Sequence, residues 1–399
     1  MSVRARLLKT FDAAVGPVLC ALLSRRQNAP ERRRLSDFPG GRILVIRPGG
    51  IGDAVLLLPM LSALRAAVPE SPVDVLCEGR NAPFFGLCPE IDRILVYDAH
   101  PFSALRALRR GRYAAVLDTE QFHNFSAVLA SRTRAPLRIG FNVNPNRLGL
   151  FTHCVNYDLA GPEDAQFLRL LCAALGRDVP LPPRFGILSR ARLPSPPPDL
   201  PSRFVLLHAG GSVPAKRWPA DRYALLCRNL TDATGLPVVL TGSSSDVPFA
   251  ARIAEGAGEA VRNLCGRLSL PETAALCAAA SLLVGPDSGL AHLSVALGTP
   301  SVVLFGPSDP VKWGPPPEAG EAVRLPLPCS PCSMFGYTKP CRGRDCLCGL
   351  SVDAVLQACL RWIAKREKNK INRLIQNCGS GCSTKAITRT GTPKSRDGI

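Results

Sequence analysis

The stretch that decides the fold is Arg42-Ile-Leu-Val-Ile-Arg47 followed by Pro48-Gly-Gly-Ile-Gly-Asp53, a short β-branched run that ends in a glycine-rich turn. Similar apolar runs recur along the chain, and longer amphipathic stretches such as 55–68 and 218–234 separate them. A repeated strand, helix, strand order requires crossover connections, so it predicts parallel sheets covered by helices on both faces. The fold class is therefore α/β. The predicted strands are 43–47, 73–77, 94–97 and 114–118, then 204–208, 238–241, 282–285 and 301–305.

The predicted strands fall into two series, and each series opens with a strand and a glycine-rich turn. This pattern predicts two Rossmann-like, doubly wound domains that face a cleft. Seven prolines between 181 and 202 remove backbone donors and favour an extended linker. The predicted segments are a basic amphipathic leader (1–41), an N-terminal domain (42–185), a linker (186–202), a C-terminal domain with a Cys-rich loop (203–349), a C-terminal helix (350–366) and a basic, disordered tail (367–399).

The composition, with 46% hydrophobic residues, excludes disorder for most of the chain. The net charge of +18 is concentrated at the two ends: residues 1–42 hold nine Lys and Arg against three acids, and residues 364–399 hold nine against two. No aromatic or recognition-helix pattern accompanies these charges, so they favour an anionic membrane surface over nucleic acid, with solvated tails as the alternative. The apolar segment 11–23 is shorter than the roughly 20 residues that span a bilayer, and it lacks the features of a signal peptide.

Most of the sixteen cysteines stand singly in apolar runs, which fits buried thiols in a reducing cytosol. Five lie within twenty residues and begin with a CxxC spacing: Cys329, Cys332, Cys341, Cys346 and Cys348. This spacing could hold zinc or an iron–sulfur cluster.

The first glycine turn places a carboxylate, Asp53, at the start of a predicted helix. Glycines let the backbone turn sharply and let a ligand approach a helix N-terminus. The spacing is not the GxGxxG of dinucleotide-binding proteins. Asp53 is therefore either an N-cap or a functional carboxylate that faces the cleft.

Two further turns carry polar residues. Gly210, Gly211 and Ser212 follow the strand 204–208, and Lys216 comes four residues later. Small residues that offer backbone N–H groups, followed by a cation, suit a diphosphate, whereas the Walker spacing is absent. The other turn holds the set Asp287, Ser288, Gly289 and His292. Its carboxylate could accept sugar hydroxyls or could merely cap a helix.

The sequence contains no Asp-x-Asp pair of the kind that holds a nucleotide sugar through a divalent metal. Its nearest approach, Asp118-Thr-Glu120, lies in the first half of the chain. We therefore expect a leaving diphosphate to be stabilised by Lys216, backbone N–H groups and a helix N-terminus, without a metal.

The motifs IRPGGIGDAVLLLPMLSALR, GSVPAKRWP, GPDSGLAH, GTPSVVLFGPSDP and CSPC occur in this order across 42–363. Together they resemble those of glycosyltransferase family 9, the ADP-heptose:lipopolysaccharide heptosyltransferases. The resemblance implies a GT-B architecture, with the acceptor on the first domain, the nucleotide sugar on the second and the last helix packing back toward the first. It also implies inverting, metal-independent transfer of L-glycero-D-manno-heptose from ADP-heptose to a Kdo or heptose hydroxyl of the lipopolysaccharide inner core, with no cofactor.

The resemblance also assigns residues. Asp53 matches the catalytic base and Lys216 matches a phosphate-binding lysine. Family members often carry a cysteine set like Cys329, Cys332, Cys341 and Cys348, which would be either a structural metal site or reduced thiols in a loop. The implied donor set is Gly210, Gly211, Ser212, Lys216, Asp246, Asp287, Ser288, Gly289 and His292. Arg47, Gly49, Gly50 and Gly52 lie on the acceptor side, where Arg47 could hold a carboxylate or phosphate of the acceptor, or could be a solvated arginine at a strand end.

The implied partners are an ADP-sugar donor, a lipid A-core oligosaccharide acceptor and the anionic inner-membrane surface, reached through the basic ends. These partners imply a cytoplasmic protein that is peripheral on the inner face of the cytoplasmic membrane. Nucleic acid is not an expected partner. One alternative is a relative that moves another nucleotide-activated sugar to a cell-surface glycan. A second is a nucleotide-sugar epimerase, although Asp53 as the one strong base candidate fits transfer better. A third is a non-catalytic binding protein, which would need no base.

Overall fold

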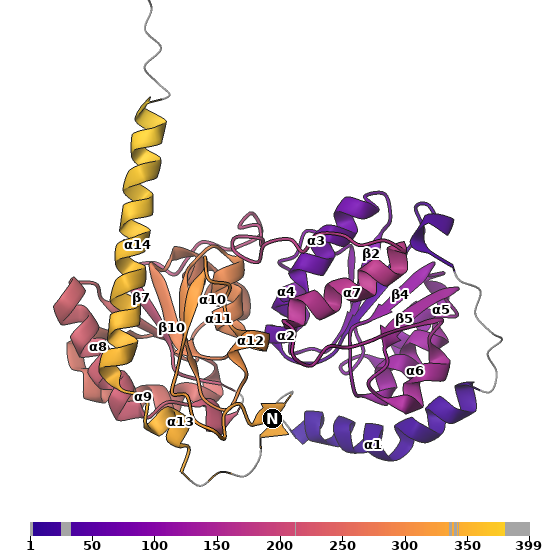
Figure 1. Ribbon diagram of the computed structural model, residues 1–399, viewed down its shortest axis with the longest axis horizontal. Helices are drawn as coiled ribbons and strands as arrows, with labels where there is room; N and C mark the ends of the chain where they lie inside the picture. Colours follow the sequence, from indigo (N-terminus) through magenta and orange to yellow (C-terminus); the bar gives the residue numbers. More distant parts are fainter. Residues whose placement is uncertain are drawn as a thin grey trace, which may run out of the picture.

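The computed structural model describes residues 3–24, 33–211, 213–334, 337–338, 341 and 343–379. Two six-stranded sheets, each covered by helices, form two domains that lie next to each other (Figure 1). Neighbouring strands are parallel throughout both sheets. The predicted α/β class with two doubly wound domains is therefore confirmed.

The first sheet has the strand order β3-β2-β1-β4-β5-β6. Its strands are β1 (Ile43–Arg47), β2 (Val73–Cys77), β3 (Arg93–Val96), β4 (Ala115–Asp118), β5 (Leu137–Phe141) and β6 (His153–Val155). The helices are α1 (Val3–Ser24), α2 (Ile51–Val55), α3 (Leu58–Ala67), α4 (Ala82–Phe85), α5 (Pro101–Arg110), α6 (Asn124–Arg132) and α7 (Glu163–Leu175), with 3-10 turns η1 (Leu35–Asp37) and η2 (Pro145–Leu150).

Every side chain of β1 is buried, because helices cover both faces of its sheet. Ile43 and Val45 pack with α2, α3, α4 and α7, whereas Leu44 and Ile46 pack with α1, α5 and α6. The helix predicted over 55–68 is divided: α2 ends at Val55 and α3 begins at Leu58. Pro59 lies in the first turn of α3, where its missing N–H costs no hydrogen bond.

The second sheet has the strand order β12-β11-β10-β7-β8-β9. Its strands are β7 (Val205–His208), β8 (Val238–Thr241), β9 (Val261–Asn263), β10 (Leu282–Pro286), β11 (Ser301–Phe305) and β12 (Gly320–Arg324). The helices are α8 (Ala220–Thr234), α9 (Val247–Ala257), α10 (Leu270–Ala279), α11 (Gly289–Ala296), α12 (Pro310–Trp313), α13 (Asp345–Cys348) and α14 (Val352–Gly379), with 3-10 turns η3 (Pro214–Lys216), η4 (Ser244–Asp246) and η5 (Gly258–Ala260). A short antiparallel pair, β13 (Ser333–Met334) and β14 (Tyr337–Thr338), precedes α13.

The chain order reverses beside the first strand of each sheet, between β1 and β4 and between β7 and β10. Such a reversal is called a topological switch point, and ligands of open α/β sheets bind there, at the carboxyl ends of the strands. One hydrophobic core joins the two domains, because residues of α3 and α4 and residues of α10 and α11 belong to the same buried cluster. The two switch points are therefore held in a fixed relation.

Two predictions about the C-terminal segment are wrong. The last helix does not pack back toward the first domain: α14 packs on α8, β10, β11 and β12 of the second domain, on the side that faces away from the first (Figure 1). Its apolar side chains Val355, Ala358 and Cys359 complete the core there, and this burial explains its position. The disordered tail predicted from 367 is wrong for 367–379, which continue α14; residues 380–399 lie outside the described residues.

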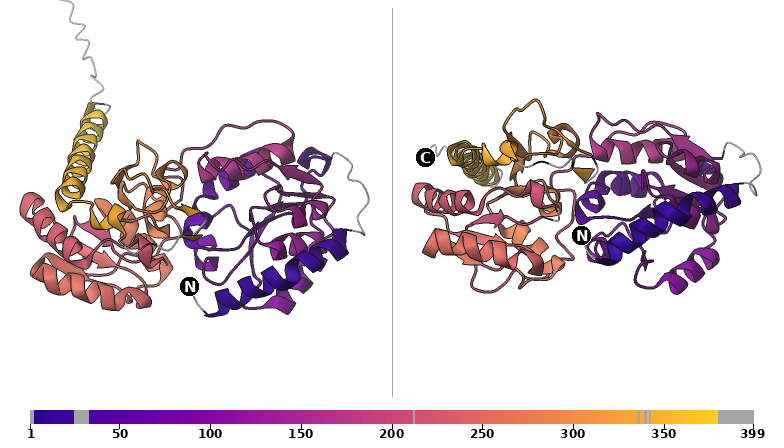
Figure 2. Two further views of the ribbon diagram at one scale, coloured as in Figure 1. Left: turned by 60° about the horizontal axis from the view of Figure 1, so that its bottom comes forward. Right: turned by 90° about the horizontal axis from the view of Figure 1, so that it is seen from below.

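The predicted leader is not a separate segment, since α1 lies against α6 and η2 of the first domain (Figure 2). Asp12 accepts hydrogen bonds from the backbone N–H groups of Asn124 (3.0 Å) and Phe125 (2.6 Å), the first two residues of α6. A carboxylate from α1 thus caps α6 and complements its dipole. Burial raises the pKa of Asp12, but hydrogen bonds with His123 and with these N–H groups lower it further, below its ordinary value.

The predicted linker is attached to both domains. The Gly186 and Leu188 N–H groups donate to the carbonyls of Val295 and Ala296, at the end of α11. The Arg192 guanidinium donates to the Cys88 carbonyl of the first domain. None of the helices described here has the length and apolar character needed to cross a bilayer.

Candidate active site

Helix α2 follows β1 and helix α11 follows β10, and both strands border the switch point of their sheet. The two helices touch each other near their N-termini. A Cβ on Gly289 would lie 3.0 Å from the Gly52 nitrogen and 3.0 Å from the Ile51 Cβ. A Cβ on Gly52 would lie 3.3 Å from the His292 Cδ2. This approach is favoured by the absence of side chains at both glycines, and it brings the turn that carries Asp53 next to the turn that carries Asp287 and His292.

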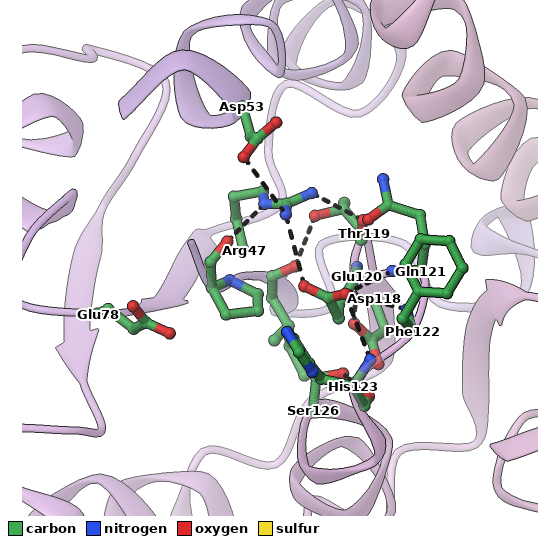
Figure 3. Close-up of polar contacts among 12 residues, drawn as sticks. Arg47, Asp53, Glu78, Asp118, Thr119, Glu120, Gln121, Phe122, His123 and Ser126 are labelled. Carbon is green, nitrogen blue, oxygen red and sulfur yellow. Dashed lines mark hydrogen bonds and ion pairs between the residues drawn. The ribbon is translucent and has the colours of Figure 1, made fainter. Parts of the chain in front are cut away.

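Asp53 lies in the first turn of α2, with its side chain one-third exposed. The N-cap of α2 is Gly50, so the interpretation of Asp53 as an N-cap is wrong. One carboxylate oxygen, Oδ2, lies 4.0 Å from a guanidinium nitrogen of Arg47 (Figure 3). Gly49 adopts φ +107° between them, a conformation that glycine tolerates. Asp53 is therefore a carboxylate at the domain boundary with a cation beside it.

Arg47 is buried at the end of β1. Its Nε donates to the Pro48 carbonyl (2.8 Å) and a terminal nitrogen donates to the Thr119 carbonyl (2.9 Å). Burial lowers the pKa of Arg47, but the nearby carboxylates, Asp53 first among them, raise it above its ordinary value. The interpretation of Arg47 as a solvated arginine is wrong. The other terminal nitrogen faces the carboxylates of Asp53 and Glu120, at 4.0 and 3.6 Å. Arg47 thus orients Asp53 by charge, and its contact with an acceptor stays a prediction.

The sequence analysis did not predict that Glu120, which follows β4, is a partner of Arg47. Its Oε1 accepts from the N–H groups of Gln121 and Phe122, and its Oε2 lies 3.6 Å from Arg47 (Figure 3). Burial raises the pKa of Glu120, but Arg47 and other partners lower it below its ordinary value. The Asp118 carboxylate also has a partner, since its Oδ2 lies 2.7 Å from a guanidinium nitrogen of buried Arg147. Glu120 follows β4, the strand next to β1, and an acid at this end of the sheet was the sequence signal that could have identified it.

A second missed feature is an ion pair between the domains. The Lys312 Nζ on α12 lies 3.0 Å from the Glu163 Oε2 at the start of α7, and both side chains are buried. Glu163 also accepts from the Gln121 amide (2.5 Å) and the Tyr157 hydroxyl. Burial raises the pKa of Glu163 above its ordinary value, although Lys312 opposes the shift. These contacts tie α12 to the loop that carries Glu120.

On the second domain, the Lys216 Nζ lies 2.5 Å from the Asp287 Oδ2, and the His292 Nε2 lies 3.6 Å from the Asp287 Oδ1. Burial raises the pKa of Asp287, but Lys216 and His292 outweigh it and hold the pKa well below its ordinary range. The N-cap of α11 is Ser288, so the capping interpretation of Asp287 is wrong. Among the described residues, the buried Ser288 Oγ has no hydrogen-bond partner, which leaves it available to a ligand.

Asp246 lies close to Gly210, but both of its carboxylate oxygens are occupied. The Arg217 guanidinium lies 2.7 Å from Oδ1, and the Ser243 N–H and hydroxyl donate to Oδ2 at 3.0 and 2.6 Å. Arg217 also donates to the Gly211 carbonyl. Asp246 thus shapes the glycine loop, and its contact with a nucleoside stays a prediction. Ser212 lies outside the described residues.

Within the part of the chain that the structure describes, no group of three or more His, Cys, Asp or Glu side chains is arranged to hold a metal ion. The four cysteines considered for a structural site are free thiols, and Cys346 is a fifth beside them. They are Cys329, Cys332, Cys341 and Cys348.

The model of glycosyltransferase family 9 (heptosyltransferase) matches residues 102–341. The chain belongs to this family. It is similar to lipopolysaccharide heptosyltransferase 2 of Escherichia coli K12, with 28% identity over 328 residues that cover 76% of this chain and 91% of the relative. The predicted family and glycosyltransferase activity are thereby confirmed.

Solved structures agree with this assignment. The structure of E. coli ADP-heptose lps heptosyltransferase II has a TM-score of 0.63 at 25% identity and covers 82% of this chain and 99% of its own. The structure of E. coli heptosyltransferase WaaC with ADP has a TM-score of 0.65 at 23% identity, and it covers 80% of this chain and 99% of its own. The GT-B architecture predicted for this glycosyltransferase is confirmed.

A methyl group at the contact of α2 and α11 tests whether this approach matters. In Gly289→Ala, the new Cβ meets backbone at 3.0 Å, so the two helix N-termini must separate by a few tenths of an ångström. We expect slower sugar transfer with little change in the melting temperature. The control is Gly86→Ala, whose Cβ makes an ordinary contact at 3.4 Å. Equal transfer rates in the two variants would contradict the importance of the contact.

Proposed function

We propose that this family 9 glycosyltransferase moves L-glycero-D-manno-heptose from ADP-heptose to a Kdo or heptose hydroxyl of the lipopolysaccharide inner core, with inversion at the anomeric carbon. The names of its relatives support the donor and the acceptor class. The observation that carries the proposal is the position of Asp53, which lies next to the contact that joins α2 to the Lys216, Asp287 and His292 cluster.

In the proposed reaction, Asp53 acts as the general base. Its carboxylate takes the proton of the acceptor hydroxyl as that oxygen attacks the anomeric carbon of the donor. The new C–O bond forms on the face opposite the diphosphate, and the bond to the phosphate oxygen breaks, so that ADP leaves with the electron pair. Attack from the opposite face gives inversion. Arg47 holds the carboxylate at its place in the first turn of α2.

The second domain provides the charges that stabilise the leaving ADP. Lys216 is a cation beside Asp287, and α11 presents N–H groups and the positive end of its dipole. In the proposed complex, Lys216 contacts the diphosphate, and the Ser288 hydroxyl adds a donor. Asp287 keeps His292 as its partner and accepts heptose hydroxyls. No metal ion or cofactor takes part in this scheme.

We further propose that the enzyme works in the cytoplasm, peripheral on the inner face of the cytoplasmic membrane, where a lipid A-core acceptor is anchored. The basic ends of the chain support an attraction to anionic lipid.

The reaction can be tested with ADP-heptose and a panel of truncated core oligosaccharides, in buffer that contains EDTA. We expect the mass of one heptose to be added to one acceptor of the panel, because charge stabilisation comes from the protein alone. Activity that returns only with added magnesium would contradict metal independence. Transfer from a different nucleotide sugar in place of ADP-heptose would favour the relative with another donor.

Removal of the base tests the role of Asp53. We expect Asp53→Ala to abolish transfer while ADP affinity changes by no more than a few fold, because the residue lies on the acceptor side. The matched control is Glu78→Gln, a carboxylate that follows the neighbouring strand β2 and pairs with Arg80 and Tyr97. Unchanged turnover in Asp53→Ala would remove this residue from the mechanism.

Removal of the cation tests the donor side. We expect Lys216→Ala to weaken ADP binding by about 1.5 to 3 kcal/mol, the scale of hydrogen bonds to charged groups. Calorimetric titration with ADP measures the change, and Lys365→Ala, on α14, is the control. An unaltered titration would show that Lys216 does not contact the diphosphate.

A further inference from the structure

The outward face of α1 is apolar although α1 lies on the protein surface. Asp12, Gly16 and Cys20, four residues apart, are buried against the first domain, and Asp12 is the only acid of the helix. The opposite side presents Phe11, Val18 and Leu22, which are 50%, 57% and 54% exposed. A surface helix normally turns its charged side chains outward and its apolar ones inward. In α1 the carboxylate points inward and these three large apolar side chains point outward. Phe11 contacts the Phe125 ring, and all three stay at least half exposed.

Helix α5, which like α1 packs against α6, adds positive charge and another exposed aromatic ring. Phe102 is 88% exposed in the first turn of α5. Arg106, Arg109 and Arg110 are exposed along the helix, and residues 99–117 contain four arginines and no acid. Arg106 and Arg110 line a hollow together with Arg93 of β3. A guanidinium-lined hollow of this kind suits phosphate groups.

These two features belong to one face of the first domain. α1, α5 and α6 pack into the same cluster on the same side of the first sheet. The Phe125 ring of α6 lies 6.4 Å from the Phe11 ring and 6.4 Å from the Tyr97 ring, which precedes α5. Figure 2 shows α1 crossing the outside of this domain. We call Phe11, Val18, Leu22, Phe102, Arg106, Arg109 and Arg110 the α1–α5 face.

We propose that the α1–α5 face docks on the surface of an anionic lipid bilayer. Apolar side chains that enter the interface, together with arginines that meet lipid phosphates, are the two contributions that hold a helix in the plane of a membrane. Arginines clustered beside exposed apolar side chains complement an anionic surface, whereas a second copy of the chain would bring the same positive charge to the contact. The inference rests on the proposed function, since a lipid-anchored acceptor requires an enzyme at the membrane surface. The face belongs to the domain that carries Asp53.

Co-sedimentation of the full chain with vesicles tests this docking. The probe is vesicles of phosphatidylethanolamine and phosphatidylglycerol, compared with vesicles of phosphatidylcholine. We expect the wild-type chain to sediment with the anionic vesicles. The double variant Val18→Ser, Leu22→Ser should lower the partition coefficient about tenfold or more, because two apolar side chains no longer enter the interface. The control is Leu181→Ser, Leu225→Ser, which changes two exposed leucines outside the α1–α5 face and should bind as the wild type does.

The charge contribution has its own variant. Arg106→Gln, Arg109→Gln, Arg110→Gln should weaken binding to anionic vesicles and flatten its dependence on salt, because screened charge attraction is what the arginines supply. Every variant should still transfer heptose to a lipid-free core oligosaccharide at the wild-type rate. This readout shows that the variants fold, and it separates a failure of docking from a failure of the proposed function.

Three results would overturn the docking proposal. They are wild-type chain that does not sediment with anionic vesicles, α1 variants that bind vesicles as the wild type does, and a dimer in sedimentation velocity that the α1 variant dissociates. The last result would identify a second copy of the chain as the partner of the α1–α5 face.

Discussion

The contact of α2 with α11 at Gly52 and Gly289 is the constraint on which the site depends. Each helix follows the switch point of its own sheet, so each carries the residues that an α/β domain offers to a ligand. A Cβ at either position would crowd the other helix, more tightly at Gly289 than at Gly52. The turn that carries Asp53 therefore lies next to the turn that carries Asp287, although the two positions are 234 apart in the chain.

The charges around this contact are arranged in pairs. Arg47 lies between Asp53 and Glu120, Lys216 meets Asp287, and Lys312 meets Glu163. A buried charge without a partner is costly, so each pair fixes the position of both members. Polar groups held in place before the substrate arrives need little rearrangement during the reaction, which is the condition for strong electrostatic stabilisation of a leaving group. A scheme without a metal depends on this preorganisation.

The sequence was sufficient for the fold class and the two domains, because strand periodicity and glycine turns are local signals. The same signals single out Asp53 and Asp287 as candidates, and the N-caps at Gly50 and Ser288 show that neither residue is needed as a cap. Their roles in the reaction stay a prediction. Contacts between distant segments left no local signal. The pairing of Lys312 with Glu163, the support of Asp53 by Arg47 and the capping of α6 by Asp12 all join residues that only the tertiary structure brings together. The predicted position of α14 was wrong for the same reason, since an apolar helix face in the sequence does not reveal which core it completes.

The most direct measurement is a crystal structure of the enzyme with an unreactive ADP-heptose analogue. The account predicts that the Asp53 carboxylate lies on the face of the anomeric carbon opposite the diphosphate, and that Lys216 contacts a phosphate oxygen with no ion between the phosphates. An Asp53 side chain that points away from the sugar, or a metal ion that bridges the two phosphates, would contradict it.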